Sequence, residues 1–150
     1  MKKIKWLLIL ALMSNLSLKA QTSATFIESG KAIRGYDPVA YFTQSKAVKG
    51  NDKLVYQWNN ANWYFSSAEN LELFKADPGK YAPQYGGYCA YGLSNGYKAP
   101  TSADAWTIEK GKLYLNYNLK VREEWNKDRQ QRIEKADRNW PGVKDKKDKG

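Results

Sequence analysis

Cys89 is the residue whose type most directly suggests chemistry. It is the only cysteine among 150 residues, and the sequence contains no histidine. The two methionines, Met1 and Met13, both fall within an N-terminal leader. Cys89 is therefore the only soft, strongly nucleophilic side chain after that leader. Its surroundings are unusual, with three glycines and three tyrosines in the stretch Pro83-Gln84-Tyr85-Gly86-Gly87-Tyr88-Cys89-Ala90-Tyr91-Gly92.

The absence of histidine excludes a Cys–His catalytic pair. Activation of the Cys89 thiol would have to come from a helix N-terminus, a nearby lysine or arginine, or backbone amides in the Gly86-Gly87 turn. The alternative is that Cys89 is a small buried hydrophobe, as most free cysteines are. Three tyrosines recur every three residues, at Tyr85, Tyr88 and Tyr91, so on a helix they would lie on one side and could surround a pocket. Ordinary core packing is the alternative for these residues.

The composition also limits metal binding. Zinc and copper sites are usually built from cysteine, histidine and some carboxylates, and one cysteine cannot complete such a site within one chain. The candidate acids for an oxygen-ligand site are dispersed along the sequence, at Asp37, Asp52, Asp77 and Asp104. We therefore expect no cofactor and no metal ligands within the chain. The remaining alternative is a metal site shared by two copies of Cys89 across a dimer.

Residues 1–20 have the pattern of a secretory signal peptide. A basic start is followed by a short apolar run over residues 6–13 and by a small residue, Ala20, at the expected cleavage position. This run is shorter than the roughly 20 apolar residues that span a bilayer. The pattern predicts a periplasmic or secreted protein with no membrane span after cleavage. In an oxidising compartment, a lone cysteine is a buried thiol, a reactive thiol or one half of an intermolecular disulfide, so a disulfide-linked dimer is one alternative.

The sequence after the leader has a moderate positive charge and no boundary that would indicate a second domain. Removal of residues 1–20 takes away four lysines and no acid, so the net charge falls from +10 to +6. The remaining excess does not form a block, and nucleic-acid binding is not expected. We expect a lead at residues 21–34, one domain at 35–141 and a disordered basic tail at 142–150.

Turn signals and hydrophobic periodicity predict a small α+β domain. Asp37-Pro38 predicts a turn before a short strand. Ser66 and Glu69 match a capping box that starts a helix, and Asp77-Pro78 predicts its end. The elements in chain order are a strand over 39–42, a hairpin of 54–58 with 63–65, the helix after Ser66, a short helix or tight loop over 84–94, a second hairpin of 106–108 with 113–117, and a long helix from 118 that Pro141 ends.

Several stretches resemble the YHS domain family. The stretch 64–81 is similar to its signature, aromatic-Phe-x-Ser followed by Phe-x-x-Asp-Pro-x-x-Tyr, and Asp37-Pro38-Val39 is similar to its opening. The similarity is greater to the exported branch called YHS domain-containing (seleno)protein, and it extends over residues 35–42, 81–90, 111–117 and 136–141. The resemblance implies a small treble-clef-like α+β fold.

The departures from the family pattern matter for function. Metal-associated YHS domains carry cysteines at places that here hold Ala40, Ser66 and Asn70. The resemblance therefore does not imply a metal role for this chain. Some members of the exported branch have selenocysteine in the region that matches Cys89. Replacing the sulfur of a cysteine by selenium is most useful where that atom takes part in a reaction. This implies a redox or thiol-exchange role for Cys89, with a resolving thiol supplied from outside.

Three functional hypotheses follow, and the sequence does not decide whether the protein is an enzyme. In the leading hypothesis, Cys89 undergoes reversible oxidation or mixed-disulfide chemistry with a small-molecule or protein thiol. Its ligand pocket would be shaped by Tyr85, Gly86, Gly87, Tyr88 and Tyr91. The second hypothesis is a non-enzymatic domain that binds a small ligand or a metal complex. The third is an interaction module with an inert buried thiol.

Overall fold

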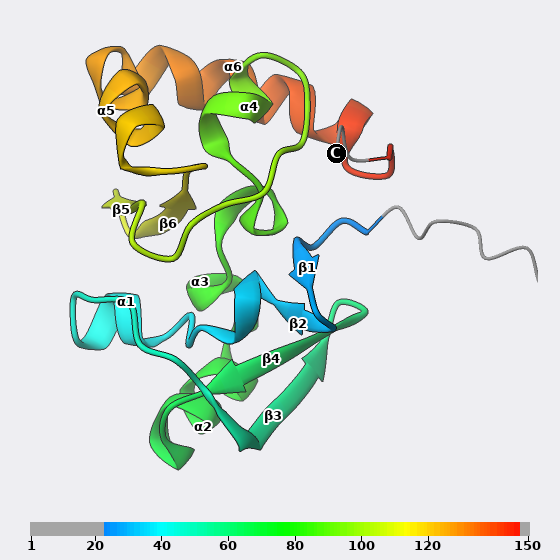
Figure 1. Ribbon diagram of the computed structural model, residues 1–150, viewed down its shortest axis with the longest axis vertical. Helices are drawn as coiled ribbons and strands as arrows, with labels where there is room; N and C mark the ends of the chain where they lie inside the picture. The colour runs from blue at the N-terminus through cyan, green and yellow to red at the C-terminus, as the bar shows by residue number, and fades with distance from the viewer. Residues whose placement is uncertain (1–22, 148–150) are drawn as a thin grey trace, which may run out of the picture.

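The structure is a computed structural model that describes residues 23–147. The expected signal peptide at 1–20 lies outside the described residues. Figure 1 shows two halves stacked along the long axis, one built on strands β3 and β4 and the other on helices α4 to α6. Helix α3 and strands β1 and β2 lie between these halves. The mixture of helices with small antiparallel sheets confirms the predicted α+β class.

Each sheet in the described residues is a two-stranded hairpin. The central two residues of each turn have positive φ, as in Asn59-Asn60 and Lys110-Gly111. This is the backbone of a type I′ turn, whose twist matches that of the flanking strands. The two predicted hairpins are confirmed; three of their strands are longer than predicted, and the last begins one residue earlier and ends two residues earlier, at Leu115. The pairs are β1 (Ile27–Glu28) with β2 (Lys31–Ala32), β3 (Asn51–Trp58) with β4 (Ala61–Phe65), and β5 (Trp106–Glu109) with β6 (Lys112–Leu115).

The helices are short except at the C-terminal end. Two 3-10 turns, η1 (Ile33–Gly35) and η2 (Gln84–Gly87), contain residues with left-handed φ. The α-helices are α1 (Ala40–Thr43), α2 (Ala68–Ala76), α3 (Pro78–Tyr81), α4 (Ala90–Ser94), α5 (Leu119–Lys127) and α6 (Arg129–Val143). Helix α2 ends at Ala76, just before Pro78, as the sequence predicted.

The buried carboxylate of Asp37 explains two wrong predictions. Its Oδ1 accepts from the backbone N–H groups of Val39 at 2.8 Å and Ala40 at 3.2 Å, so these residues begin helix α1 and not a strand. Its Oδ2 accepts from the backbone N–H and the hydroxyl of Ser66 at 2.8 and 2.7 Å. Ser66 is therefore engaged by Asp37, and the side chain that caps α2 is that of Ser67.

The predicted long helix is divided, and its end lies beyond the predicted position. Asp128 has non-helical backbone angles and separates α5 from α6. Helix α6 continues through Pro141 to Val143, whose side chain is buried. The prediction that Pro141 ends the helix is therefore wrong. Gly142 and Val143 are helical and not part of a disordered tail.

The segment expected as a lead contributes to the core. Phe26, Ala32 and Ile33 are buried. The N–H of Phe26 donates to the carbonyl of Gly86 at 2.9 Å, which fixes the segment against η2. A Cβ at Gly86 would lie 1.8 Å from the carbonyl oxygen of Ala24. Only glycine allows this approach, and its φ of +63° is also one that glycine adopts readily.

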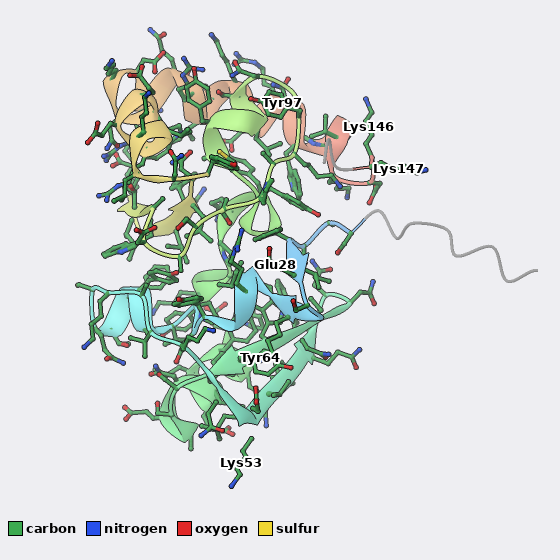
Figure 2. All side chains as sticks on the ribbon, in the orientation of Figure 1. Glu28, Lys53, Tyr64, Tyr97, Lys146 and Lys147 are labelled. Atoms are coloured by element: carbon green, nitrogen blue, oxygen red, sulfur yellow. The ribbon has the colours of Figure 1, made fainter. Side chains whose placement is uncertain are left out.

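Each half has an aromatic core. In the first half, Phe74 of α2 packs on Trp63 and Phe65 of β4, with ring centroids 5.4 and 5.1 Å apart. In the second half, Tyr114 of β6 packs on Trp125 of α5 at 5.4 Å. Apart from the buried Asp37 and Lys98, charged side chains lie at least partly exposed around these cores. Figure 2 shows Lys53 at one end of the molecule and Lys146 and Lys147 near the end of α6.

Candidate functional site

Cys89 is enclosed by protein. It follows η2 and directly precedes α4, and only 2% of its surface is exposed. Its backbone N–H donates to the carbonyl of Ala99 at 3.0 Å, which holds this turn against the loop before β5. Its thiol donates to Oδ1 of Asn116, with a sulfur–oxygen distance of 3.5 Å. The thiol therefore does not face solvent.

Burial raises the pKa of the Cys89 thiol above its ordinary value. Backbone N–H groups of Gly92, Tyr117 and Tyr91 act in the opposite direction, because they would stabilise a thiolate, but burial has the larger effect. At neutral pH the thiol is therefore protonated. A protonated, enclosed thiol is a poor nucleophile.

Asn116 is the polar partner of this thiol and is itself fully buried. Its Oδ1 also accepts from the backbone N–H of Tyr91 at 3.0 Å, which fixes the orientation of the side-chain amide. The Nδ2 group has no hydrogen-bond partner among residues 23–147. The side-chain amide of Asn116 thus accepts from the Cys89 thiol through its oxygen, while its NH₂ group makes no hydrogen bond within the described residues.

The three tyrosines near Cys89 do not surround one pocket. The hydroxyl of Tyr85 donates to Oδ1 of Asp137 at 2.8 Å. The hydroxyl of Tyr88 donates to the carbonyl of Ser23 at 2.9 Å. The Tyr91 ring lies 4.2 Å from the guanidinium of Arg132. The chain adopts a left-handed turn at Tyr85 and not a continuous helix, so the three side chains diverge.

Gly86 and Gly87 are closely packed, as expected, and the groups they pack against belong to the N-terminal segment of the protein. A Cβ at Gly87 would lie 2.4 Å from Cγ2 of Ile33, and its φ is +89°. Gly86 is packed against the backbone of Ala24. These two glycines therefore join the N-terminal segment to η2.

A groove of about 310 Å³ lies next to this turn. It is bounded by residues 24–25, the β3–β4 turn, the segment from α3 to η2, and the end of α6. Figure 1 shows the β3–β4 turn and the end of α6 on the same side of the molecule, where the chain enters β1. Of the predicted site residues, Tyr85 and Gly86 line the groove. The structure does not place Cys89, Gly87, Tyr88 or Tyr91 among its lining residues.

The groove walls are aromatic. Trp58 and Trp140, which come from opposite halves of the molecule, line it and are half-buried. Each is supported by a buried ring. Trp58 packs on Trp63 with centroids 6.0 Å apart, and Trp140 packs on Tyr85 at the same separation. Both tryptophans thus keep part of their surface available for a guest.

The polar groups of the groove are few. Lys144 is the only charged residue among those that line it. Thr25 also lines it, and the Thr25 hydroxyl is buried with no hydrogen-bond partner in the described part of the chain. The ammonium of Lys98 holds the two neighbouring chain segments together, because it donates to the carbonyls of Ser23 at 3.2 Å and Lys144 at 3.1 Å.

A second hollow of about 490 Å³ is lined by Arg34, Tyr36, Ala47 and residues 102–104. Its one cation is already engaged, since the Arg34 guanidinium donates to the carbonyl of Thr101 at 2.9 Å and pairs with Glu28 at 2.8 Å. None of the predicted site residues lines it. The aromatic groove is the stronger candidate site.

The positions where the family resemblance would place metal-binding cysteines do come together. The backbone N–H of Ala40 donates to Asp37, as do the hydroxyl of Ser66 and the amide of Asn70. Both oxygens of Asp37 are thereby occupied by donors. These residues do not form a ligand set for a soft metal. Within residues 23–147 no three histidine, cysteine or acidic side chains are grouped as a metal site would require.

Sequence reasoning missed most of the groove. It gave no ligand-binding role to Trp58, Trp63, Thr25 or Lys144. The lining residues come from segments far apart in the sequence, so no local spacing could identify them. The available signal was weaker, a tryptophan at the end of a predicted strand and another at the end of a predicted helix.

No helix within residues 23–147 combines the length and the apolar character needed to cross a membrane. Comparison of the chain with protein-family models, curated proteins and solved structures found no match.

Proposed function

We propose that this protein is a non-enzymatic binding domain, similar to the exported YHS branch, that holds a small aromatic ligand in the groove between Trp58 and Trp140. The single observation that carries the proposal is that two half-buried tryptophans face a groove of about 310 Å³. Small-molecule sites typically have volumes of about 300–1,000 Å³, aromatic walls and a few placed polar groups. Stacking on the exposed ring surfaces would supply the affinity.

The site is better prepared for binding than for catalysis. Among its lining residues there is no acid, no cysteine and one lysine, so no acid–base pair faces a guest. Proton transfer in catalysis generally needs such a positioned group. Because the resemblance implies export, the ligand would be met outside the cytoplasm.

The proposal is tested by closing the groove. Gly79 lines it, and a Cβ at this position meets only Asp77 Oδ1, at 3.9 Å, so the backbone has room for a side chain, and we expect the ring of Gly79→Phe to occupy the groove. Gly142→Phe is the matched control, because Gly142 also has open space and does not line the groove. Binding of aromatic fragments is followed through the indole N–H signals of Trp58 and Trp140 by NMR. We expect Gly79→Phe to abolish the shifts and Gly142→Phe to preserve them. Equal shifts in both variants, or none in the wild type, would overturn the proposal.

A second candidate is thiol exchange at Cys89. The observation that favours it is the set of backbone N–H groups of Tyr91, Gly92 and Tyr117, which would stabilise a thiolate once formed. In this step the Cys89 thiolate attacks an external disulfide, forms a mixed disulfide and releases the other half as a thiol. Burial of the sulfur opposes it, so the step requires local opening of the turn.

Intact mass after incubation with oxidised glutathione distinguishes the two candidates. The binding proposal predicts that the folded protein stays unmodified and that the adduct forms only in denaturant. Rapid formation of the adduct in the folded protein, absent in Cys89→Ser, would favour thiol exchange.

A further inference from the structure

We infer that the groove selects anionic aromatic ligands, with the ring held between Trp58 and Trp140 and the anionic group at Lys144. This inference rests on the proposed binding function and adds the chemical class of the ligand. It is carried by the charge of the lining. Lys144 is the only charged lining residue, so a guest meets one cation and no carboxylate.

Lys144 is suited to this role by its position. It follows the end of α6, one turn after Trp140, and the N–H of Lys144 donates to the carbonyl of Trp140 at 2.9 Å. The stacking surface and the cation are therefore fixed to each other through one turn of backbone. The Lys144 side chain is exposed, and it forms no ion pair within the described residues.

A hydrogen bond from Lys98 also holds the backbone of this turn. The Lys98 ammonium, only 2% exposed, donates to the carbonyl of Lys144 and lies 4.9 Å from the Tyr88 ring centroid. This hydrogen bond fixes the backbone of the turn that carries Lys144. A ligand that places its negative group at Lys144 gains from that charge, whereas a cationic ligand is repelled by it.

Three indole probes of similar shape and different charge test this class. They are indole-3-acetate, which is anionic, indole-3-acetamide, which is neutral, and tryptamine, which is cationic. Affinities are measured by calorimetry at low and high salt. We expect the order acetate, acetamide, tryptamine, and an affinity for the acetate that falls as salt rises, because screening weakens exposed charge pairs.

Two lysine variants locate the effect. Lys144→Gln is expected to weaken indole-3-acetate binding about threefold to fivefold, as for loss of a partly exposed ion pair, and to leave the acetamide unchanged. Lys146→Gln is the matched control, because Lys146 is exposed nearby (Figure 2) but does not line the groove. It is expected to change neither affinity by a comparable amount.

The outcomes separate this inference from the proposed function. If the acetamide binds as tightly as the acetate, or if the two lysine variants behave alike, the charge selection is wrong. Groove binding then still stands, provided that Gly79→Phe abolishes binding of all probes. If no probe binds, or if Gly79→Phe has no effect on binding, the groove itself is wrong and both proposals are overturned.

Discussion

The hydroxyl of Tyr85 donates to Oδ1 of Asp137 at 2.8 Å and thereby joins the turn before Cys89 to the middle of helix α6. The same hydroxyl lies 3.4 Å from the carbonyl of Ile133. Because the ring of Tyr85 also packs on Trp140, this contact sets the position of the groove wall. A tyrosine that first suggested a pocket around the thiol instead supports a different site.

Removal of the Tyr85 hydroxyl should destabilise the protein. Tyr85→Phe keeps the ring and its packing but deletes a part-buried hydrogen bond to a carboxylate, and we expect a cost of about 1.5 kcal/mol, at the lower end for a bond to a charged group. Urea unfolding measures the change. Tyr117→Phe is the control, because Tyr117 is 52% exposed, and little change is expected. A Tyr85→Phe protein as stable as the wild type would show that the Asp137 contact contributes nothing.

Asp37 should be the acidic residue whose replacement costs most stability. Asp37→Asn retains the shape of the side chain but sets an NH₂ group against the donors that now surround it, among them the N–H of Val39 and the amide of Asn70. We expect a loss of about 3 kcal/mol or more, since several charge-assisted bonds are affected together.

Asp52→Asn provides the comparison for Asp37→Asn. Asp52 is 81% exposed and pairs with Lys31, so a change below about 1 kcal/mol is expected. Thermal unfolding of the two variants side by side measures the difference. Equal stabilities would contradict the view that Asp37 joins α1 to α2.

The protein should lose stability in alkali. Burial is the leading cause that raises the pKa of Tyr114 to about 12, that of Tyr85 above its ordinary value of 10.0 and that of Cys89 above 9.0. Each group holds its proton more tightly in the folded chain than in the unfolded one. The stability it contributes is complete below the unfolded value and is lost as pH rises through the folded value.

The free energy of unfolding should therefore fall from about pH 9 upward, and Tyr85→Phe should make the fall less steep. Urea titrations at about pH 8 and about pH 11 measure the slope. A free energy of unfolding that is constant over this range, or the same slope in Tyr85→Phe, would contradict the assignment of these groups as buried and neutral.

The sequence predicted the elements that local pattern determines. Both predicted hairpins have alternating apolar residues and a two-residue turn, and Pro78 marks the end of α2. Prediction failed where a distant residue decides the local conformation. Ser66 has the residue type and spacing of a helix cap, but the carboxylate of Asp37, far away in the sequence, engages it.

The candidate site was less predictable than the fold. Cys89 was singled out by its rarity, and rarity does not determine exposure. Burial of the thiol depends on packing against Asn116 and on contacts that no spacing reveals. Trp58 and Trp140 form a site only because the two halves of the molecule meet at η2 and residues 24–25.

Nuclear Overhauser effects between a bound probe and labelled protein test most directly whether the groove is the binding site. With indole-3-acetate as the probe, we expect contacts from its ring protons to the indole protons of both Trp58 and Trp140, and none to the β-protons of Cys89. Contacts to the Cys89 turn without contacts to either tryptophan would contradict this expectation and return the thiol to the centre of the function.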